Sequence, residues 1–262
     1  MIRVRIDKAD GVMTITLCEP PANTYSYEMM RELDAAVLEA RMDPDVHVVV
    51  LTGDGDRFFC AGADIKTLTS VTTDYKYMFC LHANETLLRL ENTPKLIIAA
   101  IAGHCVGGGL EVAMACDLRI ARKGSGKCGL PEVKLGVLPG TGGTQRLVRI
   151  VGRSSAIKLM AEAELFDFDR ALALGLVDEV VDLDPAAFRQ HIQTYAQRFT
   201  APNAAPKAIG FIKRAVVSGA DMGLEQGLAL ERELQQRLFC GEDAKEGMAA
   251  NLEKRPAKFK GL

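Results

Sequence analysis

Hydrophobic and polar positions change their spacing repeatedly along the first fifty residues, and each change marks a new element. Apolar residues alternate with polar ones over residues 2–6 and 12–17, on either side of an Asp10-Gly11 turn, which predicts a β-hairpin. Over residues 27–41 they recur at helical spacing. A mostly apolar run follows at 46–53 and ends in glycine, as in a buried strand. The chain therefore begins as strand, strand, helix and strand.

The same alternation of strands and helices continues to about residue 185. Residues 96–102 form a second apolar run that ends near glycines, and the chain resumes as a helix that contains Glu111. Asp64 precedes another helix start and is placed to cap it. We predict the remaining elements as helices at 75–91, 154–162 and 169–174, a further helix that starts after Gly142, Gly143 and Thr144, and strands at 117–121 and 175–181. Residues 1–185 are therefore expected to form an α/β core.

After residue 185 the strand signal ends, and helical segments follow one another to the end of the chain. They are predicted at 186–199, 204–218, 223–240 and 242–253. The third is amphipathic, and its expected apolar side consists of Leu224, Leu228, Leu234 and Leu238. We place a boundary near residue 185 and expect residues 186–262 to pack against the core or against a neighbouring subunit.

Composition narrows the class of protein. The chain has 262 residues, of which 48% are hydrophobic and 25% are charged, and its net charge is −2, as in an ordinary globular protein. Near-neutral charge without long basic runs argues against nucleic acid as the main partner. The N-terminus lacks the pattern of a secretory signal, and no apolar run reaches membrane-spanning length. We therefore expect no membrane insertion.

The cysteines support a reducing location. The chain has seven of them, an odd number, and most stand singly among apolar residues: Cys18, Cys60, Cys80, Cys105, Cys116, Cys128 and Cys240. Thiols in such positions behave as small buried hydrophobic side chains rather than as a disulfide framework. We therefore expect a cytoplasmic protein with reduced cysteines.

Two loops share a construction in which glycine or alanine stands directly at a helix start. They run from Cys60 to Asp64 and from Val106 to Glu111. The unpaired N–H groups of a first helical turn point outward with partial positive charge, so they suit an oxygen that becomes an anion. Either glycine turn alone is compatible with a purely structural role, but two such loops suggest a pair.

Two carboxylates accompany these loops. Glu111 lies one turn into the helix after the second loop, and Glu132 follows Pro131 at a predicted strand end. Paired carboxylates divide acid and base work when their environments separate their pKa values. The spacing also allows a surface salt bridge for Glu111 and a simple helix-start role for Glu132.

The spacing of the other candidate residues does not match any further catalytic, metal-binding or phosphate-binding motif. The histidines, His47, His82, His104 and His191, lie on different elements, and neither they nor the cysteines have the spacing of a zinc site. The glycine-rich segment before Glu111 lacks both the Gly-Lys-Ser/Thr ending of a phosphate loop and the spacing of a dinucleotide fingerprint. No serine or cysteine stands in a nucleophile elbow.

Over essentially its whole length, the chain resembles the enoyl-CoA hydratase/isomerase family, the crotonase superfamily. The matching segments are FFCAGADI (58–65), IAGHCVGGGLEVAMACDLRIA (101–121), GLPEVKLGVLPGTGGTQRL (129–147), RALALGLVDEVV (170–181) and AKEGMAANLEKRPAKF (244–259). The resemblance implies an α/β fold, a crotonase-like spiral of repeated strand–strand–helix units with a helical C-terminal region. It also implies a homotrimer or a hexamer built from two trimers.

The resemblance further implies an acyl-CoA thioester as substrate. Its carbonyl oxygen is expected to accept hydrogen bonds from the backbone N–H groups of Ala63 and Gly108, which form an oxyanion hole. Contacts to CoA or to the acyl group are expected from Ala61, Asp64, Ile65, Lys66, Gly140 and Lys254. Four positions depart from the family pattern or have an open role: Leu130, Asn251, Tyr25 and Tyr27. For the two tyrosines we favour packing over a limit on the acyl pocket.

The expected reaction is reversible addition of water to a trans-2-enoyl-CoA, because both glutamate positions typical of hydratases are present. Glu111 would act as base on the water, and Glu132 would supply a proton to the α-carbon. The mechanism needs no metal or redox cofactor, and coenzyme A enters only as part of the substrate. Isomerisation, dienoyl-CoA hydration and acyl-CoA decarboxylation remain alternatives on the same scaffold, and a non-catalytic acyl-CoA-binding role is a further one.

Overall fold

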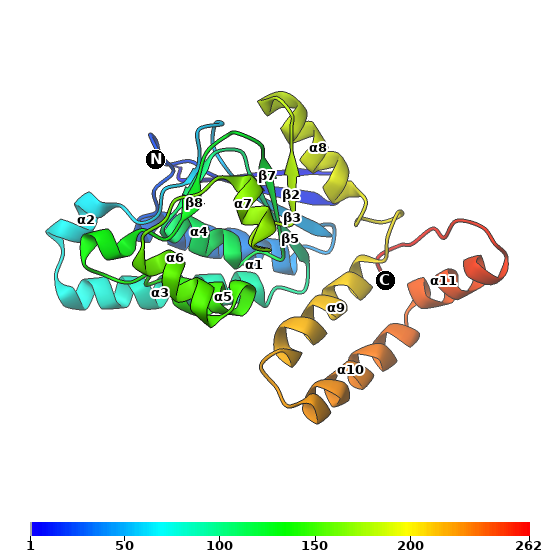
Figure 1. Ribbon diagram of the computed structural model, residues 1–262. Helices are drawn as coiled ribbons and strands as arrows, with labels where there is room; N and C mark the ends of the chain where they lie inside the picture. Colours follow the sequence, from blue (N-terminus) through cyan, green and yellow to red (C-terminus); the bar gives the residue numbers. More distant parts are fainter. Residues whose placement is uncertain (1) are drawn as a thin grey trace.

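The predicted β-hairpin forms one edge of a six-stranded sheet. The computed structural model describes residues 2–262 (Figure 1). The hairpin strands are antiparallel, and every later neighbour in the sheet is parallel. In spatial order the strands are β1 (Val4–Ala9), β2 (Val12–Leu17), β3 (Val48–Gly53), β5 (Leu96–Ile101), β7 (Leu118–Arg122) and β9 (Glu179–Val181). Successive turns of the chain thus add strands in one direction across the sheet.

A second, three-stranded parallel sheet lies beside the first. Its strands are β4 (Phe58–Cys60), β6 (His104–Val106) and β8 (Cys128–Gly129), in that order. Each follows a strand of the large sheet along the chain, and a helix then leads to the next turn. The predicted α/β spiral of strand–strand–helix units is confirmed.

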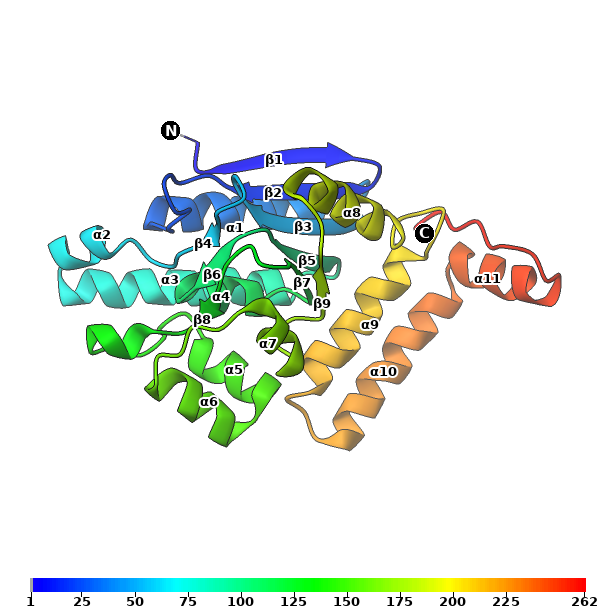
Figure 2. The ribbon, with the colours of Figure 1, turned by 45° about the horizontal axis from the view of Figure 1, so that its top comes forward.

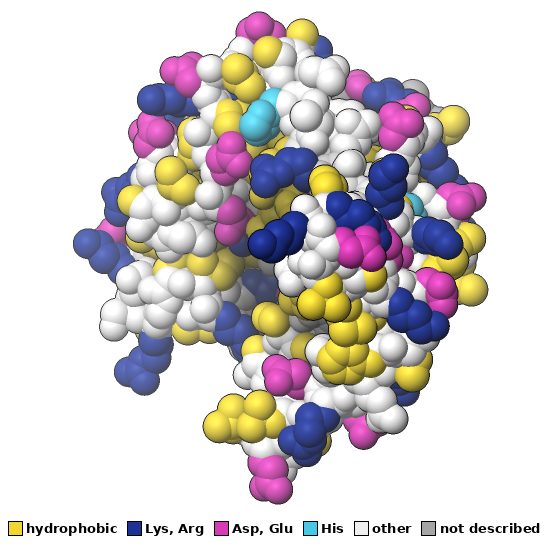
Figure 3. Space-filling view, turned by 90° about the vertical axis from the view of Figure 1, so that its right-hand side faces the viewer, with side chains coloured by type: hydrophobic (Ala, Val, Ile, Leu, Met, Phe, Trp, Pro, Cys, Tyr) yellow, Lys and Arg dark blue, Asp and Glu magenta, His cyan; other side chains and the backbone are white. Residues whose placement is uncertain are grey.

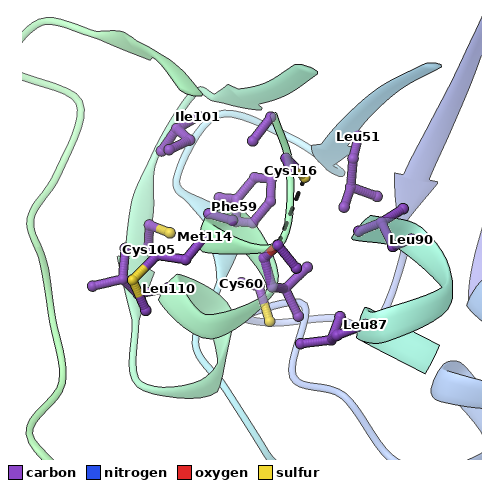
Figure 4. Packing of buried hydrophobic residues seen from close by; sticks show 14 of the residues in the cluster. Leu51, Phe59, Cys60, Leu87, Leu90, Ile101, Cys105, Leu110, Met114 and Cys116 are labelled. Carbon is purple, nitrogen blue, oxygen red and sulfur yellow. Dashed lines mark hydrogen bonds between the residues drawn. The ribbon is translucent and has the colours of Figure 1, made fainter. Parts of the chain in front are cut away.

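The hydrophobic core fills both faces of the large sheet, because alternate residues of its strands point to opposite sides. On one face, Leu51 of β3 packs with Phe59, Leu87 and Leu110 in the cluster seen in Figure 4. The helices of the spiral are α1 (Tyr27–Met42), α2 (Ile65–Ser70), α3 (Thr73–Glu91), α4 (Gly108–Met114), α5 (Gly143–Val151), α6 (Arg153–Ala161) and α7 (Phe168–Ala173), with a 3₁₀ turn η1 (Glu132–Leu135). All of these helices except α2 contribute buried side chains to the cluster on this face. None of the helices described within residues 2–262 has the length and apolar character needed to cross a bilayer.

The opposite face of the sheet is covered by the first helix after the expected boundary. Phe188 and Ile192 of α8 (Pro185–Gln197) are buried in a cluster with Val48 and Val50 of β3. Beyond it, α9 (Pro206–Gly219) and α10 (Leu224–Phe239) lie side by side, and α11 (Glu242–Leu252) follows (Figure 2). The division at residue 185 stays a prediction.

The leucines assigned to the apolar side of α10 differ in exposure in the single chain, and packing of this side against a neighbouring subunit stays a prediction. Of the four leucines assigned to the apolar side of α10, only Leu234 is buried, at 3% exposure, whereas Leu224 is 80% exposed. The reason is that α10 packs mainly on α9, which also leaves Ile212 exposed. Hydrophobic side chains lie in the open on the side of the molecule that bears these helices (Figure 3).

Candidate active site

The two glycine loops meet at the carboxyl ends of β4 and β6. These strands are parallel neighbours, so the loops that leave them start side by side. A Cβ atom placed on Gly62 would lie 2.9 Å from the backbone nitrogen of Gly108, and one on Gly109 would lie 2.0 Å from the carbonyl oxygen of Cys60. Gly62 also has a φ of +87°, which disfavours any side chain there. Glycine is therefore required for the two loops to touch.

Both predicted donors are free. Within residues 2–262, the N–H groups of Ala63 and Gly108 donate to no acceptor. Gly108 opens α4, so its N–H belongs to the unpaired first turn of a helix. Two adjacent free N–H groups are what a developing oxyanion needs, and this agreement supports the assigned role, which stays a prediction.

Glu111 is buried at 2% exposure, so the alternative interpretation of this residue as part of a surface salt bridge is wrong. Its Oε1 accepts hydrogen bonds from the backbone N–H groups of Thr141, at 2.8 Å, and Gly143, at 2.6 Å. Burial raises the pKa of Glu111, and these two donors oppose the rise because they stabilise the ionised form. The carboxylate is thus held in one orientation by the loop that enters α5.

Glu132 begins η1, separated from the end of β8 by two residues, and its carboxyl group faces the second glycine loop. Its Oε1 lies 2.9 Å from the position that a Cβ on Gly107 would take. Its Oε2 is buried and has no hydrogen-bond partner in the described part of the chain. Burial, with a smaller contribution from the charge of Glu111, raises the pKa of Glu132 to about 7. The helix-start reading of Glu132 is confirmed, and the residue also lies beside Glu111.

Residues expected along the CoA path lie around the first loop. Asp64 caps α2 through the N–H groups of Lys66 and Thr67, as predicted, and the pKa of its carboxyl group is lowered chiefly by the hydroxyl of Thr67. Ile65 and Lys66 are exposed, and Ala61 is half-buried and donates its N–H to the carbonyl of Ala22. These positions leave the side chains of α2 accessible to a ligand.

Gly140 lies on the loop that holds Glu111. Its carbonyl accepts a hydrogen bond from the side-chain amide of Asn84, and a Cβ at Gly140 would lie 3.5 Å from the sulfur of Cys80. Leu130 is buried, and a Cβ placed on Gly143 would lie 3.0 Å from its Cδ1. Leu130 therefore packs beneath the same loop. Asn84, Cys80 and Thr141 were missed by sequence reasoning, because only the fold brings α3 against this loop.

Lys254 and Asn251 are far from these residues in a single chain. Asn251 is in α11 and Lys254 follows it, on the side of the molecule opposite α2 (Figure 1). The structure does not bring Lys254 together with Lys66. Any contact between Lys254 and the same CoA molecule would have to come from a second copy of the chain.

A cavity of about 440 Å³ lies away from this site, between α8 and strands β1, β2, β3 and β5 of the large sheet. Its charged lining includes Arg5, which is paired with Asp54 at 3.3 Å, and it contains none of the predicted site residues. In the part of the chain that is described, no three His, Cys, Asp or Glu side chains are grouped as a metal site. The expectation of a reaction without metal or redox cofactor stays a prediction.

The family model for enoyl-CoA hydratase/isomerase matches residues 7–262. The chain belongs to this family, and it is an enzyme of this family. It is 39% identical to a probable enoyl-CoA hydratase of Bacillus subtilis, across 99% of this chain and 98% of that protein. It is also 38% identical to the (E)-benzylidenesuccinyl-CoA hydratase of Thauera aromatica, across 98% of this chain and 99% of that one.

Solved structures of this family agree in fold. An enoyl-CoA hydratase from Bacillus anthracis superposes with a TM-score of 0.93 at 32% identity and covers the whole of both chains. A protein named "Enoyl-CoA hydrates" from Geobacillus kaustophilus gives a TM-score of 0.96 at 44% identity, over 99% of this chain and 97% of that one. The crotonase-like architecture is therefore confirmed.

Proposed function

We propose that this enzyme adds water reversibly to a trans-2-enoyl-CoA to give a 3-hydroxyacyl-CoA. The observation that carries this proposal is the Glu132 carboxyl group, whose buried Oε2 lacks a partner among the described residues while Glu111 lies nearby. A catalytic acid should have a proton at neutral pH and a free oxygen facing the substrate. The pKa of about 7 at Glu132 meets the first condition.

The reaction follows from the electronics of the thioester. The carbonyl oxygen accepts hydrogen bonds from the N–H groups of Ala63 and Gly108, which draws electrons away from the conjugated double bond. Water then attacks the β-carbon and gives a proton to Glu111, while the α-carbon of the enolate-like intermediate takes a proton from Glu132. Proton exchange with solvent returns both carboxyl groups to their starting states.

The two glutamates suit different tasks because their surroundings differ. Glu111 accepts two backbone hydrogen bonds that favour its ionised form, whereas the free Oε2 of Glu132 gains nothing comparable. Two carboxyl groups whose environments separate their pKa values can divide base and acid work. Glu111 is accordingly the base and Glu132 the acid.

The direct test is incubation with crotonyl-CoA while the conjugated absorbance is followed. Glu111→Gln and Glu132→Gln should each lower kcat by ~10²–10⁴, and Glu85→Gln, an exposed glutamate on α3, should leave it unchanged. A panel of longer and aromatic enoyl-CoAs would define the acyl group. Absence of turnover on the whole panel would sink the proposal, and full activity of either site variant would favour isomerase-like chemistry.

We also propose that the chain assembles as a homotrimer, or as a hexamer of two trimers, through its C-terminal helices. Exposed apolar side chains on α9 and α10, such as Ile212 and Leu224, would lose contact with water in such an assembly. A second copy could also bring Lys254 to a CoA phosphate. Light scattering after size-exclusion chromatography should give a trimeric or hexameric mass, and Ile212→Glu should reduce it; a monomeric wild type would refute the assembly.

The proposed location is the cytoplasm. All seven cysteines are free, and Cys60, Cys105, Cys116 and Cys128 are buried. An oxidising compartment would favour disulfides in their place. Cell fractionation followed by thiol titration under denaturing conditions should find the protein in the cytoplasmic fraction with seven reactive thiols.

A further inference from the structure

One tyrosine contacts both glycine loops and the loop that holds Glu111. Tyr25 lies in the loop before α1, is 4% exposed, and forms an isolated parallel bridge with Ala63. Its N–H donates to the carbonyl of Gly62 at 2.9 Å, and its carbonyl accepts from the N–H of Asp64 at 3.1 Å. Because successive backbone groups of an extended segment point in opposite directions, this bridge turns the N–H of Ala63 away from Tyr25. The backbone of Tyr25 therefore orients the first oxyanion donor.

The side chain of Tyr25 reaches the second donor. A Cβ on Gly108 would lie 2.2 Å from the Tyr25 hydroxyl oxygen and 2.6 Å from its Cε1. The edge of the ring is therefore packed directly against the Gly108 backbone, at a distance that only glycine permits. Phe79 of α3 supports the ring, with 5.9 Å between centroids. Tyr25 thus sets the position of both donor loops.

The hydroxyl of Tyr25 extends the connection to the base. It shares a buried hydrogen bond of 2.8 Å with Oγ1 of Thr141, and the N–H of Thr141 is one of the two donors to Glu111. Thr141 is itself buried. A continuous path thus runs from the Glu111 carboxylate through Thr141 and Tyr25 to Gly108.

We infer that Tyr25 is a positioning residue, whose hydrogen bond with Thr141 holds the Glu111 loop in register with the two oxyanion donors. The inference rests on the proposed function, because it concerns the same reaction. The base and the donors act on opposite ends of one conjugated system, so their separation must match the substrate. An error of about 1 Å in such a distance can lower a rate by about 10²-fold.

Paired substitutions separate this role from ordinary packing. Tyr25→Phe removes only the tyrosine hydroxyl. Thr141→Val removes the threonine hydroxyl and keeps the shape of the side chain, whereas Thr141→Ser retains that hydroxyl. Tyr27→Phe is the matched control, because Tyr27 is 37% exposed and its ring contacts Tyr75 and His82. Each variant is assayed for kcat, KM and melting temperature.

The expected result is a fall of about tenfold in kcat for Tyr25→Phe and for Thr141→Val, with little change in KM. The double variant should fall no further than either single one, because both remove the same hydrogen bond. Thr141→Ser should recover most of the kcat that Thr141→Val loses, and Tyr27→Phe should keep wild-type kcat. If Tyr25→Phe and Thr141→Val lower the melting temperature alone, or if their effects on kcat multiply, the positioning role is wrong.

A second readout keeps this test separate from the proposed function. Wild-type turnover of enoyl-CoAs decides the hydratase proposal, whereas the ratio of variant to wild type decides the role of Tyr25. If the wild type does not hydrate, amide hydrogen exchange at Thr141 and Gly143 can be followed by NMR, because the N–H groups of these two residues donate to Glu111. Tyr25→Phe and Thr141→Val should speed this exchange whereas Tyr27→Phe should not, and unchanged exchange in the first two variants would overturn the inference.

Discussion

Gly62→Ala would place a methyl group beside the N–H of Gly108, the second proposed oxyanion donor, without altering either glutamate. Its Cβ would lie 2.9 Å from the Gly108 nitrogen and 3.3 Å from the carbonyl oxygen of Val106. The φ of +87° adds backbone strain. Left-handed backbone costs a residue with a side chain ~1–2 kcal/mol, and crowding in a packed site adds ~1–3 kcal/mol.

Gly55→Ala isolates the first of these costs. Gly55 has a φ of +78°, but a Cβ there would meet nothing within 4 Å. In urea unfolding, Gly55→Ala should therefore lose ~1–2 kcal/mol, and Gly62→Ala should lose ~2–5 kcal/mol. The difference between the two variants measures the crowding against Gly108.

The two variants should differ more strongly in activity. Loss of one oxyanion donor lowers kcat by ~10²–10³, which corresponds to ~2.7–4 kcal/mol of transition-state stabilisation. Hydration of crotonyl-CoA under conditions where both variants are folded should show this loss for Gly62→Ala and wild-type kcat for Gly55→Ala. Wild-type kcat in Gly62→Ala would refute the assignment of the Gly108 N–H as a donor to the substrate.

The remaining predictions concern titration and burial. The rate of hydration should fall as pH rises through about 7, because Glu132 loses its proton there. A rate that does not change between pH 6 and pH 9 would contradict the role of Glu132 as acid. Folding raises the pKa of Glu132 from 4.5 to about 7. Protonation of Glu132 therefore contributes its whole share of the folding free energy below pH 4.5, and this contribution is lost as pH rises through 7. Glu132→Gln should therefore raise the melting temperature relative to wild type at pH 8 more than at pH 5, and equal effects would argue against a buried proton. Lys213→Met breaks the buried pair between α9 and Asp117, at 2.8 Å, and should cost ~3–5 kcal/mol in urea unfolding, whereas Lys207→Met on the exposed side of α9 should cost almost nothing.

Local patterns were sufficient for much of the fold and for singling out the two glycine loops, Glu111 and Glu132 as candidates. The hairpin around Gly11, the cap at Asp64 and the C-terminal helices depend on residues close together in the chain, so alternation, helical spacing and capping chemistry predicted them. Glu111 and Glu132 could be proposed as partners because each follows a glycine or proline that breaks a regular element. These signals all act over a few residues.

Tertiary structure decided what these residues touch. The bond between Tyr25 and Thr141 joins positions 116 apart, and the fold alone brings the Thr141 N–H to Glu111. The exposure of Leu224 likewise depends on how many neighbours α10 has, not on its amphipathic pattern. Hydrophobic spacing specifies which side of an element seeks burial, but the partner, and therefore the geometry of a site, depends on chain segments far away in the sequence.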